Sequence, residues 1–179
     1  MISLGLDPGG KKGTAWAVYD SESDWLTVGV EKPREWQDPA CSAWEMVGSL
    51  VVRHKVTVVG VEVPHIPRLP KSALPHEHEK LLVVIYAQGA AALKLAEVVG
   101  ACKAAAYEHE CRVVDLQPAT IKQAITGKGN ASKEQVRRMV ETLYGARMEM
   151  VRNPREKKVL REDEADATAI ALAAQRRVE

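Results

Sequence analysis

Two acidic residues each stand at the end of an apolar run. Asp7 follows Ile2-Ser-Leu-Gly-Leu and precedes Pro-Gly-Gly, and Glu62 lies near the end of the β-branched run 56–63. An acid at the end of a strand can hold a metal ion or orient a water molecule. Aspartate before Pro-Gly is also favourable turn chemistry. Asp7 taken alone therefore leaves both interpretations open.

A second pair of acids lies near the end of the chain. Asp163 and Asp166 are three residues apart, so their carboxylates share one face of the helix predicted there. Alanines make that helix slim enough to bring the pair close to a strand end: Ala165, Ala167, Ala169, Ala171, Ala173 and Ala174. By themselves, the two aspartates are also explained as acids that the helix dipole favours at a helix start.

All four acids together would form an unusual cluster. Carboxylates gathered without cations repel one another and raise each other's pKa values. Hard divalent cations such as Mg²⁺ relieve that repulsion because they prefer oxygen ligands. Two such ions, about 3.5–4 Å apart, suit an in-line attack on a phosphodiester. The sequence therefore predicts a metal-dependent hydrolytic centre with the catalytic and metal-binding residues Asp7, Glu62, Asp163 and Asp166.

Positive charge is concentrated beside these acids. Residues 112–161 carry twelve lysines and arginines against five acids, a net charge of +7, whereas the segments on either side each have a net charge of −3. This pattern indicates a polyanion held over the carboxylates, and the alternative is a solvated basic face. Phosphate contacts of this kind position DNA without reading its sequence. The candidates are Lys11, Lys12, Lys122, Lys128, Lys133, Arg137 and Arg138.

The pattern of elements predicts an α/β fold. Strands are expected over 2–7, 14–19, 25–31, 56–63 and 111–116. Helices are expected over 39–54, 79–110 (divided at Gly89), 118–126, 132–144 and 162–177, with residues 147–161 irregular. On the first helix, Trp44, Val47, Leu50 and Val51 should be buried. The order predicts a five-stranded mixed sheet, three antiparallel strands and then two parallel ones, in a single domain over 1–179.

Composition narrows the class of protein. No run of residues approaches the length of a membrane span, and no signal peptide is visible at the start. Three cysteines without metal-type spacing, Cys41, Cys102 and Cys111, argue against a disulfide framework and favour reduced thiols in a cytoplasm.

Five pieces of the chain resemble a known family when taken in order. They are LGLDPGGKKGTAWAV, VVGVEV, ALKLAEVVGA, ATIKQAITGKGNASKEQV and DEADATAIALA. They are similar to RuvC-type Holliday-junction resolvases, members of the ribonuclease H-like superfamily. The resemblance implies helices on both faces of the sheet and a metal-binding role for the four acids. It also implies that Lys122 and Lys133 contact DNA near the scissile phosphate.

The resemblance further implies an activity: symmetric nicking of two strands of a four-way DNA junction, in DNA recombination and repair. Two Mg²⁺ ions per active site, with Mn²⁺ as a substitute, and a homodimer are implied as well. A branch-migration helicase partner is not identified by the sequence. His65 stands where the family carries an inserting aromatic residue, and it is a further candidate for DNA contact. The Pro-rich stretch 64–75 and the segment 66–89 look longer than in bacterial relatives, which fits a phage-type or divergent member.

Three alternatives stay open. Another ribonuclease H-like nuclease, acting on flaps, RNA–DNA hybrid or duplex, would use the same acids. A non-catalytic binder of branched DNA would not need all four acids, so their presence argues against it. The spacing Asp-x-Gly-x-x-x-Gly from Asp7 to Gly13 also occurs in the actin and sugar-kinase superfamily. Those proteins need two such domains, and this chain has room for one.

Overall fold

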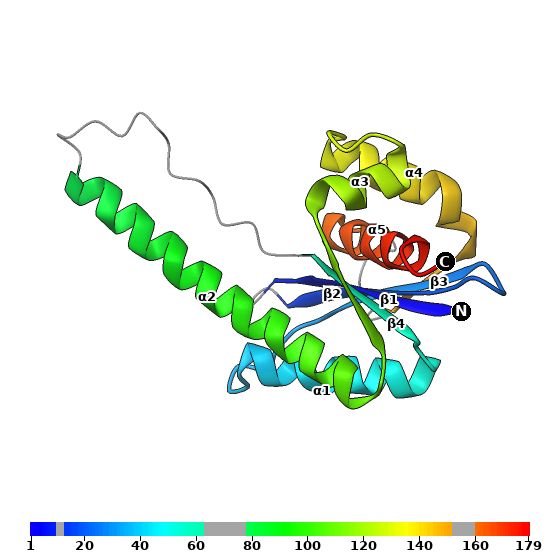
Figure 1. Cartoon of the computed structure of the whole chain (residues 1–179), viewed down its shortest axis with the longest axis horizontal. Coiled ribbons are helices and arrows are strands. Elements are labelled where there is room, and N and C mark those ends of the chain that lie inside the picture. The colour runs from blue at the N-terminus through cyan, green and yellow to red at the C-terminus, as the bar shows by residue number, and fades with distance from the viewer. Residues whose placement is uncertain (10–12, 63–77, 152–159) are drawn as a thin grey trace.

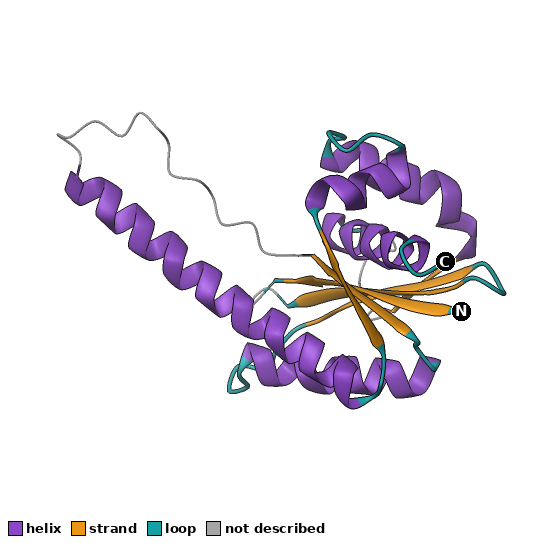
Figure 2. Cartoon of the chain, in the orientation of Figure 1, coloured by secondary structure: helices purple, strands orange, loops and turns teal. Residues whose placement is uncertain are grey.

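A six-stranded mixed sheet with helices on both of its faces forms the body of the molecule (Figure 1, Figure 2). This computed structural model describes residues 1–9, 13–62, 78–151 and 160–179, with the backbone alone for 78–88. The strands are β1 (Ile2–Pro8), β2 (Thr14–Asp20), β3 (Trp25–Glu31), β4 (Val58–Glu62), β5 (Arg112–Leu116) and β6 (Met148–Val151). The helices are α1 (Pro39–His54), α2 (His78–Glu108), α3 (Pro118–Thr126), α4 (Lys133–Tyr144) and α5 (Glu162–Arg176), with a 3-10 turn at Gly145–Arg147.

The sheet has the spatial order β5-β4-β1-β2-β3-β6. Strand β1 is antiparallel to β2 and parallel to β4, while β3 is antiparallel to β2 and parallel to β6. The strands β1, β3, β4, β5 and β6 therefore all end at one edge of the sheet. Loops that follow parallel strands meet at such an edge, which is where open α/β sheets bind ligands.

Each face of the sheet has its own hydrophobic core. Leu4 and Leu6 of β1 pack with residues of α1 and α2, and Ala15 and Ala17 of β2 pack with residues of α3, α4 and α5. This division follows from the alternation of side chains along each strand. Figure 2 shows the resulting three layers, with α1 and α2 on one side and α3, α4 and α5 on the other.

Helix α5 lies unusually close to the middle of the sheet. Gly5 of β1 and Gly60 of β4 are partners in register. A Cβ at Gly5 would lie 2.0 Å from the backbone oxygen of Ala167, and one at Gly60 would lie 2.7 Å from the Cβ of Ala174. Two adjacent glycines and an alanine-rich helix thus allow a backbone approach that larger side chains would prevent.

Most element boundaries agree with those predicted from the sequence, and so does the α/β architecture with helices on both faces. The predicted helix start at Asp38 is confirmed, because its carboxylate accepts hydrogen bonds from the amides of Ala40 and Cys41. The capping box opened by Ser132 is confirmed too.

Three predictions were wrong in detail. The sheet has six strands rather than five, because residues 148–151 form β6 beside β3. That strand has four residues, and Met148 and Met150 are the two that pack on the core. So short an alternation of apolar residues, within a basic segment, is a weak indication of a strand. Helix α2 is not divided at Gly89. Trp44 was predicted to be buried but is 43% exposed. The buried face of α1 includes its neighbour Ala43, together with Val47.

Among the described residues, no helix is both long enough and apolar enough to cross a membrane.

Candidate active site

A cavity of about 300 Å³ opens at the edge of the sheet where β1 and β4 end. Three carboxylates line it, those of Asp7, Glu62 and Asp166. Two lysines line it as well: Lys122 on α3 and Lys133 on α4. These five charged residues come from two strands and three helices that are far apart in the sequence.

The register of the sheet explains how the acids meet. Gly5 and Gly60 face α5, and side chains two residues further along each strand point to the same face. Those residues are Asp7 and Glu62, which lie next to each other because Leu6 pairs with Val61. Since α5 packs over the two glycines through Ala167 and later residues, its first turns reach the strand ends and carry Asp166 into the cavity.

The carboxylates interact strongly with one another. Burial, together with the negative charges of Asp166, Asp163 and Glu62, raises the pKa of Asp7 from 3.8 to about 7. Burial is also the largest cause of the raised pKa of Glu62 and of Asp166, and the charge of Asp166 adds to the shift at Glu62. Near neutral pH, full ionisation of this cluster is therefore unfavourable without added positive charge.

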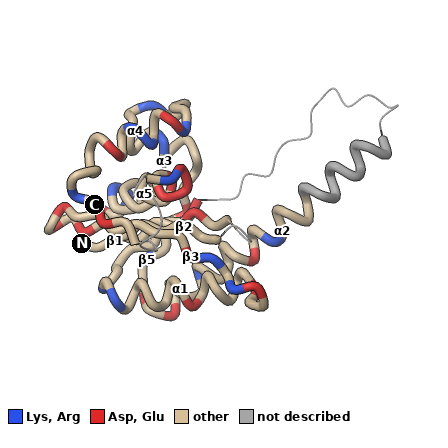
Figure 3. Tube along the Cα trace, turned by 180° about the vertical axis from the view of Figure 1, so that it is seen from behind, with Lys and Arg blue, Asp and Glu red and all other residues tan. Residues whose placement is uncertain are grey.

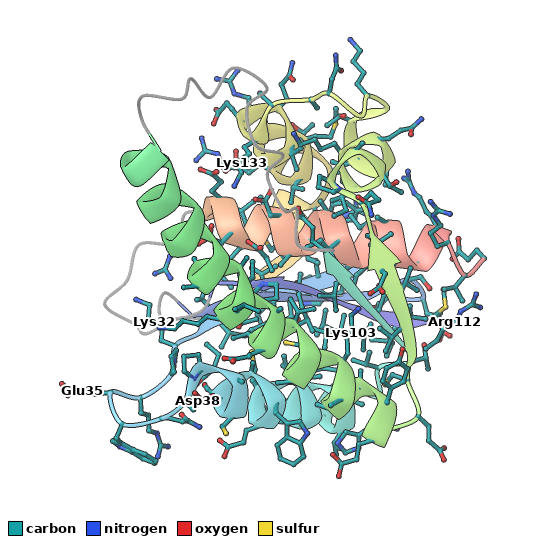
Figure 4. The ribbon with its side chains drawn as sticks, turned by 60° about the vertical axis from the view of Figure 1, so that its left-hand side comes forward. Lys32, Glu35, Asp38, Lys103, Arg112 and Lys133 are labelled. Atoms are coloured by element: carbon teal, nitrogen blue, oxygen red, sulfur yellow. The ribbon has the colours of Figure 1, made fainter. Side chains whose placement is uncertain are left out.

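Lys133 supplies positive charge to the cluster. Its Nζ lies 3.1 Å from Oδ2 of Asp166 and 2.9 Å from Oε1 of Glu162. These hydrogen bonds raise the pKa of Lys133, with Glu162 as the largest cause. Its charge in turn lowers the pKa values of Asp7 and Glu62, though by less than the other effects raise them. Figure 4 shows Lys133 beside the start of α5.

Asp163 differs from the other three acids in its exposure to solvent. Its side chain is exposed and does not line the cavity, although its charge acts on both Asp7 and Asp166. No three acidic, histidine or cysteine side chains in the described parts of the chain stand at metal-binding spacing. The donor set nevertheless fits a hard divalent cation, because it consists of mutually repelling carboxylate oxygens.

The predicted DNA-binding residues fall into three groups. Lys122 and Lys133 line the cavity. Lys128 is exposed in the turn after α3, while Arg137 and Arg138 form ion pairs with Glu134 on α4. Figure 3 shows that basic residues on α3 and α4 neighbour the acidic start of α5. The other candidates, Lys11, Lys12 and His65, lie outside the described residues, as does the Pro-rich stretch 64–75.

Sequence reasoning missed Glu162, the second partner of Lys133. A signal for it existed, because Glu162 and Asp166 are four residues apart and so share a helix face.

The raised pKa of Asp7 predicts a pH-dependent stability. An acid with a higher pKa in the folded protein than in the unfolded chain destabilises the fold as pH rises, and its penalty is complete above the folded pKa. In EDTA, we expect D7N to be more stable than the wild type by an amount that grows from pH 4 to pH 8. The pKa shift sets an upper limit of about 4 kcal/mol.

Thermal unfolding of both proteins across this pH range measures that difference. D115N is the matched control, because Asp115 is half exposed on β5 and pairs with Lys103 on α2. A constant difference between D7N and the wild type would contradict the assigned pKa.

Sequence comparison finds clear relatives. The family model described as "Crossover junction endodeoxyribonuclease RuvC" matches residues 80–174. A protein with that name from Chromohalobacter salexigens is 32% identical over 171 residues, covering 96% of this chain and 78% of the relative. Another from Oleidesulfovibrio alaskensis is 31% identical over 149 residues, covering 80% of this chain and 78% of the relative.

Solved structures show the same fold. Thermus thermophilus RuvC in complex with a Holliday junction substrate has a TM-score of 0.65 at 23% identity, covering 99% of this chain and 96% of that one. The yeast mitochondrial Holliday junction resolvase Ydc2 has a TM-score of 0.52 at 17% identity, covering 97% and 77%. These likenesses confirm the predicted ribonuclease H-like fold.

Proposed function

This chain belongs to the RuvC family of crossover junction endodeoxyribonucleases, and we propose that it cuts Holliday junctions at the cavity between β1, β4 and α5. It is a divalent-metal-dependent nuclease that acts on four-way DNA in recombination and repair. The observation that carries the proposed location is the coupled set of Asp7, Glu62 and Asp166 with two lysines at its rim.

Each acid has a proposed role in binding metal. Asp7, which lines the cavity with Glu62 and Asp166, would be the ligand shared by two Mg²⁺ ions, with Mn²⁺ as a substitute, and Asp163 would complete the set. When bound, two divalent cations supply the positive charge that activates water and offsets the charge growing on the phosphate. Leu95 and Val99 of α2 form an apolar part of the cavity wall.

The two lysines are proposed to contact the DNA backbone. Lys122 and Lys133 approach the acids from α3 and α4, so a phosphate bound over the carboxylates would lie within their reach. Lys128 and Arg137 would extend this contact along the basic face. For Lys11, Lys12 and His65, DNA contact stays a prediction, as do the single domain and the cytoplasmic location.

Helix α2 supports the proposed homodimer. Its residues 89–97 are mostly exposed, and they are small or apolar apart from Lys94 and Glu97; Leu93 is 68% exposed. Figure 1 shows this helix extending past the edge of the sheet at which β1 and β4 end. Two symmetric cuts need two active sites related by a twofold axis. An apolar helix surface of this kind can provide the contact between copies.

A panel of DNA substrates at fixed salt tests the proposal. With Mg²⁺, we expect a synthetic four-way junction to be nicked symmetrically and at least about tenfold faster than a flap, an RNA–DNA hybrid or a linear duplex, because junction selectivity defines this activity. In Ca²⁺, sedimentation of the junction complex should give two chains per junction. Faster cutting of the hybrid or flap would favour the alternative nuclease, and one chain per junction would contradict the dimer.

A further inference from the structure

Two acids of α5 hold one lysine of α4. Glu162 and Asp166 are one helical turn apart, and both reach Nζ of Lys133, at 2.9 Å and 3.1 Å. Both residues of the Lys133–Glu162 pair have a helical backbone. Lys133 is the first residue of α4, directly after the N-cap residue Ser132, and Glu162 is the first residue of α5. The ammonium is therefore held between the starts of two helices.

The two acids differ in their surroundings. The side chain of Asp166 is 21% exposed and lines the cavity, whereas that of Glu162 is 55% exposed and lies outside the cavity lining. Asp166 is also a proposed metal ligand, so its oxygens have a second use. Glu162 has no proposed metal-binding role, so its carboxylate is free to keep the hydrogen bond to Lys133 when Asp166 binds a metal ion.

The hydrogen-bonding capacity of Lys133 leaves room for DNA. An ammonium group has three N–H donors. Among the described residues, Glu162 and Asp166 account for two of them. A third donor can point to a phosphate oxygen over the carboxylates. An exposed ion pair adds little stability, so orienting the ammonium is the larger consequence of this contact.

We propose that Glu162 is a positioning residue for junction cleavage, which acts by holding the Lys133 ammonium over the scissile phosphate. This inference rests on the proposed function of the cavity. A positioning role and a general effect of charge predict different results when Glu162 is replaced. Removing a negative charge near DNA should strengthen binding, whereas removing a positioning contact should slow the cutting of bound DNA.

The variant E162A separates these two effects. We expect kcat for junction nicking to fall about tenfold, since a misplaced catalytic group costs up to about a hundredfold in rate. Junction affinity in EDTA should stay equal or become tighter. The variant E162Q keeps a hydrogen-bond acceptor and should lose less activity than E162A. Unchanged or faster nicking by E162A would overturn the inference.

A metal-free measurement tests the contact itself. In EDTA, the rate at which an acylating reagent modifies each lysine can be followed by mass spectrometry. We expect E162A to raise the modification rate of Lys133 severalfold and to leave that of Lys128 unchanged. The matched control is E141A, which removes an exposed glutamate of α4 about two turns from Lys133. Equal modification rates of Lys133 in the wild type and in E162A would show that Glu162 does not hold Lys133, and would overturn the inference.

A double-mutant cycle identifies the route of the effect. If Glu162 acts through Lys133, E162A should change kcat little in a K133A background. A full additional tenfold loss there would overturn the inference. Failure of the wild type to nick any junction would instead reject the proposed function, which keeps the two failures distinguishable.

Discussion

Replacing Asp7 with asparagine should reduce junction nicking by about a thousandfold while junction binding survives. Asp7 lines the cavity together with Glu62 and Asp166, and the charges of both of these acids raise its pKa. Asparagine keeps the shape of the side chain but removes the charge that would hold a cation. Loss of one strong electrostatic group at a reaction centre costs up to about 4 kcal/mol, roughly a thousandfold in rate.

Single-turnover nicking of a four-way junction with Mg²⁺ measures the rate, and anisotropy in Ca²⁺ measures binding. The matched control is D115N, which makes the same change at a half-exposed position on the α2 side of the sheet. It should keep wild-type activity. Retained nicking by D7N would reject the assigned site, whereas loss of binding together with nicking would indicate misfolding.

Replacing Gly5 with alanine should strongly destabilise the fold. A Cβ at this position would lie 2.0 Å from the oxygen of Ala167 and 2.3 Å from the nitrogen of Ala171, and both are backbone atoms that cannot rotate away. Overpacking of a core commonly costs about 1–3 kcal/mol, and we expect about 3 kcal/mol here. For a chain of this length, the melting temperature should fall by roughly 6–12 °C.

G100A is the matched control for this substitution. Gly100 lies within α2, and a Cβ there would meet nothing within 4 Å. Alanine is the better helix former by up to about 1 kcal/mol, so this variant should be as stable as the wild type or more stable. If G5A melted at the wild-type temperature, the close approach of α5 to β1 would be contradicted. Differential scanning calorimetry of both variants gives the comparison.

Local patterns were enough to predict most elements. Asp38-Pro39 and the Ser132 capping box each supply their own hydrogen-bond partners within four residues, so the helix starts follow from the sequence alone. The β-branched run that forms β4 is similarly clear. By contrast, β6 is too short to be recognised in the sequence. It pairs with the edge of β3 that faces away from β2.

The candidate site was predictable as a set of residue types but not as an arrangement. Asp163 and Asp166 looked equivalent on one helix face, yet Asp166 lines the cavity and Asp163 is exposed. The difference depends on which face of α5 packs against the sheet. Contacts of α5 with Gly5 and Gly60, which are far from it in the chain, determine that orientation. Glu162 was missed because its partner, Lys133, lies on another helix.

The sequence by itself determined the chemistry available to this protein: four acids in family order, a basic block, and the helices and strands that carry them. Those properties are local, since they depend on residue type and spacing along the chain. Only the tertiary structure decided which side chains meet. The register between β1 and β4 places Asp7 beside Glu62. The close packing of α5 on the sheet then brings Asp166 to the same cavity as Asp7 and Glu62, and it brings Glu162 to Lys133. Packing of this kind sets distances between residues that are remote in sequence.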